Sequence, residues 1–248
     1  MDKKKIYKIY AGVNGAGKST LYHLYDTDKS EKRINSDEIL KKNGGDWRNI
    51  SDQGKAMKEA VLQIKKCFQE GVSFNQESTL TGKTIIGNIR KAKELGYSVQ
   101  LHYVGLDSPE LAIQRVKNRV NEGGHGIDEA TIRSRYNASL GNLKEAVLIC
   151  DSAIVYDNSK EFKDVGRTEN GVWVEFDKQC AWLNKAFPNV GLDKDRTRED
   201  NLGNKKEKSS RMSMQSYMMQ ITKRKETDKE KHPDLYHKSK GRENRDRC

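Results

Sequence analysis

The stretch GVNGAGKST at residues 12–20 decides the fold. It fits the pattern GxxxxGK[ST], whose glycines let the backbone wrap around a phosphate group with its N–H groups pointing inward. The apolar segment 6–13 precedes it and a helical pattern follows, which is the context that a P-loop requires. In such a loop Lys18 binds the β- and γ-phosphates, and the Ser19 hydroxyl is a hard oxygen ligand for Mg²⁺. The sequence therefore predicts a site for ATP and Mg²⁺ formed by Gly12, Asn14, Gly15, Ala16, Gly17, Lys18, Ser19 and Thr20.

The rest of the first 190 residues alternates strand-like and helix-like segments. Expected strands lie at 6–13, 32–35, 72–77, 97–105 and 152–156, and a hairpin at 163–176. Expected helices lie at 18–25, 51–70, 83–95, 109–120 and 129–149, with a further helix capped by Ser36. Strands separated by helices are typical of a parallel sheet covered on both faces. We predict an α/β fold of the P-loop NTPase class, with a mostly parallel five-stranded sheet, helices on both faces, a lid and a polar C-terminal tail.

Within this pattern, the segment 51–70 has the clearest helical period. Its apolar residues recur every three or four positions, as expected for one buried face of an amphipathic helix. They are Met57, Val61, Ile64 and Phe68.

The charge of the chain is unevenly distributed. The net charge is +11, and residues 191–248 carry 17 Lys and Arg against 11 Asp and Glu. This segment lacks a sustained period, so we expect residues 1–190 to form the catalytic domain and 191–248 a basic tail that is disordered or folds on a partner. Nucleic acid is one possible partner of such a tail. There is no apolar run of membrane-spanning length and no secretory pattern at the N-terminus, so a soluble, cytoplasmic protein is expected.

Two predicted strands end in polar side chains. Asp37 follows the second strand, and Glu77 and Thr79 end the third. Because the carboxyl ends of parallel strands line the ligand crevice, Asp37 is placed to accept a proton from an attacking hydroxyl or to help hold Mg²⁺. Glu77 and Thr79 are placed to hold an acceptor molecule. The alternatives are that Asp37 only caps a helix and that the other two form a strand-end turn.

A glycine-rich break at 123–126 separates two segments that contain arginines. Arginines carried by a lid can stabilise the negative charge that spreads over the γ-phosphate oxygens during transfer. The candidates are Arg115, Arg119, Arg133 and Arg135, and His125 within the break is a candidate lid contact. The alternative for each arginine is an ordinary solvated helix residue.

Four segments, within the range 5–159, resemble the zeta toxin family of P-loop kinases in order and spacing. They are AGVNGAGKST (11–20), INSDEI (34–39), NQESTLTG (75–82) and GGHGIDEATIRSRYNASLGNL (123–143). The resemblance implies a Mg²⁺- and ATP-dependent kinase for a small hydroxylated metabolite. In the characterised toxins this acceptor is the 3′-hydroxyl of the amino sugar of UDP-N-acetylglucosamine.

The resemblance also assigns residue roles. It implies that Lys18 binds phosphate, Asp37 is the base, and Arg119 and Arg133 are catalytic phosphate clamps. Acceptor-binding roles fall on Asp37, Glu77, Thr79 and Arg135, and Asn158 falls where such kinases pass the adenine. The family's usual restraint is an antitoxin, and the Met-rich tail is a candidate for the same role in cis.

Two other functions stay open from the sequence. One is a nucleotide-gated P-loop protein that binds nucleic acid through its tail. The other is a kinase that acts on another nucleotide, a polynucleotide end or an antibiotic hydroxyl.

Overall fold

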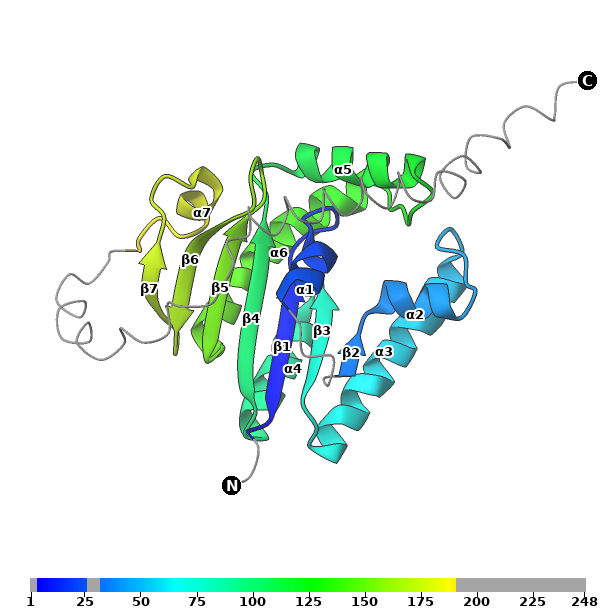
Figure 1. The fold of residues 1–248 in the computed structure, drawn as a ribbon, viewed down its shortest axis with the longest axis horizontal. Helices are drawn as coiled ribbons and strands as arrows, with labels where there is room; N and C mark the ends of the chain where they lie inside the picture. The colour runs from blue at the N-terminus through cyan, green and yellow to red at the C-terminus, as the bar shows by residue number, and fades with distance from the viewer. Residues whose placement is uncertain (1–3, 26–31, 191–248) are drawn as a thin grey trace, which may run out of the picture. The chain divides into compact units, whose positions relative to one another are not determined.

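The strands of this chain form one sheet in the computed structural model, which describes residues 4–25 and 32–190 (Figure 1). They are β1 (Ile6–Ala11), β2 (Lys32–Ile34), β3 (Phe74–Ser78), β4 (Ser98–Gly105), β5 (Ser152–Asp157), β6 (Lys163–Glu169) and β7 (Val172–Phe176). Their order in this seven-stranded sheet is β2-β3-β1-β4-β5-β6-β7. β1 to β5 pair in parallel, whereas β6 and β7 are antiparallel. The predicted α/β class is confirmed.

The predicted number of five strands is wrong, because the hairpin continues the sheet. Only residues 158–162 connect β5 to β6, and a parallel crossover needs a dozen or more residues. The chain therefore turns back and pairs β6 antiparallel to β5. The β6–β7 turn is made by Asn170 and Gly171, with φ of 48° and 79°, as the Asn-Gly signature predicts.

Helices follow the strands in sequence. They are α1 (Lys18–Tyr25), α2 (Ser36–Lys42), α3 (Ile50–Glu70), α4 (Lys83–Glu94), α5 (Pro109–Asn121), α6 (Glu129–Ile149) and α7 (Ala181–Ala186). The N-cap of α2 is Asn35 and not Ser36, because the Asn35 side chain accepts a hydrogen bond from the Asp37 backbone N–H at 2.9 Å. None of the helices in the described ranges is long and apolar enough to cross a membrane.

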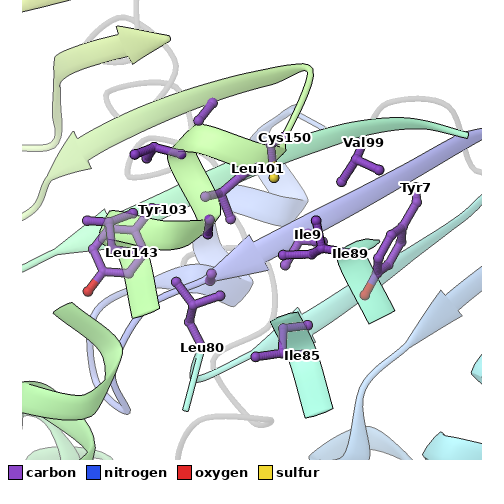
Figure 2. Packing of buried hydrophobic residues seen from close by; sticks show 14 of the residues in the cluster. Tyr7, Ile9, Leu80, Ile85, Ile89, Val99, Leu101, Tyr103, Leu143 and Cys150 are labelled. Carbon is purple, nitrogen blue, oxygen red and sulfur yellow. The ribbon is translucent and has the colours of Figure 1, made fainter. Parts of the chain in front are cut away.

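The main core lies between one face of the sheet and the helices that cover it (Figure 2). Alternate residues of β1 and β4, such as Ile9 and Leu101, point to this face and pack with Ile89 of α4 and Leu143 of α6. The opposite face carries α1, whose Tyr22 ring meets the ring of Tyr10 edge to face. Helices thus lie on both faces, as predicted.

The apolar stripe of α3 is divided between two environments. Ile64 and Phe68 are buried in the main core, but Met57 is 60% exposed and Val61 40% exposed. The predicted amphipathic helix is confirmed, but its apolar stripe is buried only in the C-terminal half. The N-terminal half packs through Ala56 on a second, small cluster with Ile39 and Leu40 of α2, next to Trp47 and Ala60. The side chains of Met57 and Val61 are therefore free to line a cavity beside the N-terminal half of α3.

The predicted tail at 191–248 lies outside the described residues. Its expected disorder, its binding to nucleic acid and its action in cis stay predictions.

Candidate active site

The loop between β1 and α1 has the wrapped shape that its glycines predict. Gly12 has φ of 137°, and a Cβ there would lie 2.2 Å from the carbonyl oxygen of Val104 on β4. Gly17 has φ of 103°, and its Cβ would lie 2.6 Å from Nδ2 of Asn158. Asn158 in turn donates from Nδ2 to the carbonyl oxygen of Ala16 at 2.8 Å. Positions 12 and 17 therefore admit only glycine, and Asn158 fixes the outer side of the loop.

Lys18 begins α1 and is nearly buried. Its side chain donates from Nζ to the carbonyl oxygen of Val13 at 3.2 Å, and the residue is 7% exposed. Nζ also lies 3.8 Å from Oε1 of Glu77. Burial lowers the pKa of the Lys18 ammonium group, and the nearby carboxylates of Glu77 and Asp37 oppose this effect. The loop thus holds a desolvated positive charge where a phosphate would bind.

Glu77 contacts several of the polar groups around this lysine. β3 lies beside β1 in the sheet, and this pairing brings the carboxylate to the start of α1. Ser19 donates from Oγ to its two oxygens at 3.0 and 3.2 Å. Arg33 donates to Oε2 at 2.8 Å and Asn35 donates to the same oxygen at 3.0 Å. Glu77, predicted to hold an acceptor, therefore directs its carboxylate to the phosphate-binding loop.

A cavity of about 330 Å³ opens beside the loop. One wall is polar and includes Lys18, Asp37, Glu77 and Thr79, and the facing wall is formed mostly by α3. Thr79 shares a hydrogen bond of 2.8 Å with Thr81, which also lines the cavity. The exposed half of the α3 stripe belongs to this second wall. The cavity can therefore take a molecule with both polar and apolar surface.

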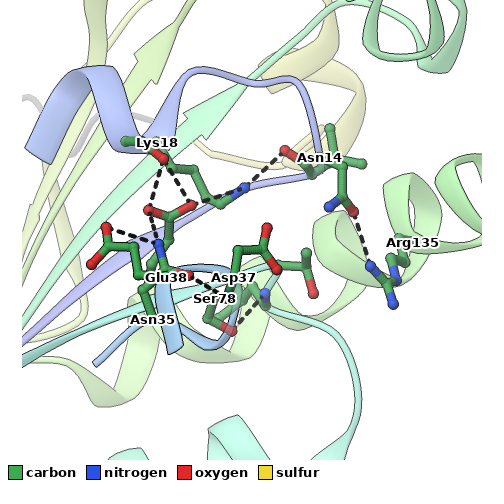
Figure 3. A network of polar contacts seen from close by, with 12 residues as sticks. Asn14, Lys18, Asn35, Asp37, Glu38, Ser78 and Arg135 are labelled. Carbon is green, nitrogen blue, oxygen red and sulfur yellow. Dashed lines mark hydrogen bonds and ion pairs between the residues drawn. The ribbon is translucent and has the colours of Figure 1, made fainter. Parts of the chain in front are cut away.

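Asp37 lies in the first turn of α2 and projects between Lys18 and Arg135 (Figure 3). Its backbone N–H is used by the helix cap, and within residues 4–25 and 32–190 no group donates a hydrogen bond to its carboxylate. Its negative charge acts on Lys18, His125 and Arg135. An exposed carboxylate without a partner can accept a proton from a bound molecule.

The four candidate arginines have different positions. Arg135 of α6 lines the cavity and donates to Oδ1 of Asn14 at 3.1 Å, and burial lowers the pKa of its guanidinium group. The positive charge of Arg119 on α5 lies close enough to Lys18 to lower the pKa of its ammonium group. In the part of the chain that the structure describes, Nε and Nη2 of Arg119 are buried without a hydrogen-bond partner. Such unpaired donors are costly unless an anion satisfies them. The structure brings Arg119 and Arg135 to the site.

The other two arginines donate to groups outside the cavity lining. Arg133 is exposed and forms an ion pair with Glu110 of α5. Arg115 donates to the backbone carbonyl oxygen of Ser159 at 3.4 Å. The sequence could not separate these pairs, because all four arginines lie on helices next to the same glycine-rich break.

The glycine-rich break packs against Trp47, which the sequence did not single out. The ring centroids of His125 and Trp47 are 5.5 Å apart. Burial lowers the pKa of His125, so its imidazole is favoured in the neutral form. A Cβ on Gly126 would lie 2.6 Å from the Trp47 ring and 2.8 Å from Cγ2 of Val120. The α5–α6 connection and the α2–α3 loop thus meet at one close contact.

Substituting Gly126→Ala tests this contact. The added methyl group overlaps the Trp47 ring, so we expect a loss of about 1–3 kcal/mol in stability and a displaced tryptophan. With Trp173 and Trp182 changed to Phe, the Trp47 emission should move to longer wavelength as the ring meets water. Gly141→Ala is the matched control, because nothing lies within 4 Å of a Cβ at that position. Unchanged emission in Gly126→Ala would show that the contact does not hold the loops together.

The P-loop after β1, the adjacent carboxylate on β3 and the sheet order are those of a P-loop kinase fold. The family model described as Zeta toxin matches residues 1–168, so the chain belongs to the zeta toxin family. The predicted family is confirmed.

One relative and two solved structures are similar to this chain. A protein of Haemophilus influenzae, described as an uncharacterized protein, is 35% identical over 136 residues, which cover 55% of this chain and 94% of that protein. A chain of the AvrRxo1-ORF1:-ORF2 crystal structure with ATP superposes with a TM-score of 0.59 at 14% identity, over 77% of this chain and 66% of that one. This chain thus spans just under two thirds of that protein.

A second solved structure is described as the PezAT chromosomal toxin–antitoxin system of Streptococcus pneumoniae. It superposes with a TM-score of 0.50 at 18% identity, over 79% of this chain and 83% of that one. At these identities the two structures support the fold alone.

Proposed function

We propose that this chain transfers the γ-phosphoryl group of ATP to a hydroxyl group of a small molecule, with the 3′-hydroxyl of UDP-N-acetylglucosamine as the leading acceptor. The observation that carries the proposal is the Asp37 carboxylate, which lines the cavity together with Lys18 and receives no hydrogen bond from the described residues. Family membership and the P-loop kinase fold support the reaction class.

The nucleotide is bound by the loop at 12–20. Its backbone N–H groups and the Lys18 ammonium group hold the β- and γ-phosphates. The Ser19 hydroxyl and the Glu77 carboxylate lie 3.0 Å apart, and oxygen donors of this kind fit Mg²⁺. When bound, Mg²⁺ would neutralise charge on the phosphate oxygens.

The transfer step needs one proton acceptor and several positive charges. The acceptor hydroxyl oxygen forms a bond to the γ-phosphorus, and the bond from this phosphorus to the β–γ bridging oxygen breaks, which leaves ADP. The hydroxyl proton passes to Asp37. Lys18, Arg119 and Arg135 stabilise the charge on the transferring group. Arg133 is left out of these roles because it is paired with Glu110.

The acceptor is proposed to bind between the two walls of the cavity. Thr79 and the neighbouring polar side chains Thr81 and Asn88 can hydrogen-bond a sugar or a nucleotide, while Met57 and Val61 cover its less polar side. Other nucleotides and antibiotic hydroxyls remain alternative acceptors of the same reaction.

A protein partner is also proposed. The AvrRxo1 structure pairs ORF1 with ORF2, and PezAT is described as a chromosomal toxin–antitoxin system. We infer that a cognate antitoxin restrains this kinase by covering the nucleotide site or the cavity.

The test is a transfer assay with the full chain, Mg²⁺, ATP and a panel of UDP-sugars and nucleosides, read by mass spectrometry. A gain of one phosphate on UDP-N-acetylglucosamine would establish the reaction and the acceptor together. ATP consumption with a different phosphorylated product would replace the acceptor. Binding of ATP without any turnover across the panel would contradict the kinase proposal and favour a nucleotide switch.

A further inference from the structure

Arg33 of β2 is the group most closely attached to Glu77, although it does not line the cavity. Its Nη2 donates to Oε2 of Glu77 at 2.8 Å, and its Nε donates to Oε1 of Glu38 at 2.8 Å. The side chains of Arg33 and Glu77 are each 11% exposed. The guanidinium plane also lies over the Tyr22 ring of α1, 3.5 Å from its centroid. Two carboxylates and a ring therefore fix one arginine in position.

The two oxygens of Glu77 face different cations. Oε2 takes the bond from Arg33, whereas Oε1 lies 3.8 Å from Nζ of Lys18. A distance of 3.8 Å is an ion pair without a good hydrogen bond, so Lys18 keeps its donors for another group. Without the bond to Arg33, Coulomb attraction in this buried setting would draw Glu77 onto Lys18.

We propose that Arg33 is a positioning residue for nucleotide binding, which holds the Glu77 carboxylate toward Ser19 and off Lys18. Lys18 then stays available to the phosphates. This inference rests on the proposed function, because it needs the loop to bind ATP. It adds a residue outside the P-loop motif and outside the cavity, which acts only through Glu77.

A double-mutant cycle tests this proposal on the full chain, with the affinity for Mg²⁺ and a non-hydrolysable ATP analogue measured by calorimetry. Arg33→Gln should weaken binding by about tenfold, the size of one lost charge-assisted hydrogen bond. In a Glu77→Gln background the carboxylate that Arg33 would hold off Lys18 is absent, so the same substitution should weaken binding by less than about twofold. Lys32→Gln is the matched control, because it removes an exposed charge from the same strand, and it should leave affinity unchanged.

An equal loss in both backgrounds would overturn the proposal, because it would mean that Arg33 supports the fold of β2 and not the Glu77 carboxylate. An unchanged affinity in Arg33→Gln would overturn it as well. Failure of the proposed function is a separate result, since it would appear in the transfer assay as ATP binding without turnover by the wild-type chain, whatever the outcome of the binding cycle. Thermal unfolding of each variant identifies any variant that does not fold.

Discussion

Asp37→Asn should lower turnover by about 10³-fold while the affinity for MgATP stays within about twofold. Asparagine has the same shape as aspartate but cannot take the proton of the acceptor hydroxyl. The cap of α2 is kept, because it uses the Asn35 side chain and the backbone N–H at position 37. In the proposed site the nucleotide is bound by the loop at Lys18, whose residues the substitution leaves unchanged. Single-turnover kinetics and calorimetry would measure the two effects separately.

Asp46→Asn is the control for this experiment. It removes an acidic side chain that is 56% exposed and outside the cavity lining, so turnover should not change. A similar turnover in wild type and Asp37→Asn would remove Asp37 as the proton acceptor. If Asp37→Asn lowered the affinity for MgATP as well as turnover, the result would indicate that the Asp37 carboxylate helps to hold Mg²⁺.

Lys18→Met should weaken ATP binding by more than about 100-fold, because it removes the charge that faces the phosphates. The thermal stability of the folded chain, in contrast, should not decrease. The Lys18 ammonium group is nearly buried, and burial lowers its pKa, which shows that the folded chain disfavours this charge. Methionine fills a similar volume without that cost, so we expect an unfolding midpoint equal to or above that of the wild type.

Lys144→Met is the matched control on the exposed side of α6, and it should leave both ATP affinity and stability nearly unchanged. Calorimetric titration with ATP and thermal unfolding provide the two measurements. A large drop in the unfolding midpoint of Lys18→Met would contradict the inference that burial of the Lys18 charge destabilises the folded chain.

The sequence was sufficient to predict the features that depend on local pattern. The loop at 12–20, the five parallel strands and the Asn-Gly turn all have short-range signatures, and the structure contains each of them. The extension of the sheet to seven strands was missed because it depends on the pairing of β6 with β5, which no local pattern specifies.

The sequence indicated which residues form the site better than it indicated which groups those residues contact. Asp37, Glu77 and Thr79 do line one cavity, as their positions after strands indicated. The direction of the Glu77 carboxylate follows from the strand order, which places β3 directly beside the P-loop strand. Arg33 had no signal, since a charged residue in a short strand is usually solvated and its partner lies 44 residues away in sequence.

The small cluster of Ile39, Leu40 and Ala56 has a consequence for how the cavity works. It gives α2 and the first half of α3 a packing centre of their own, which meets the main core at Ala60, and this part of the molecule carries both Asp37 and the apolar wall. A unit with its own interior can tilt as a rigid body without losing its internal contacts. The distance from base to phosphate then depends on what fills the space between them.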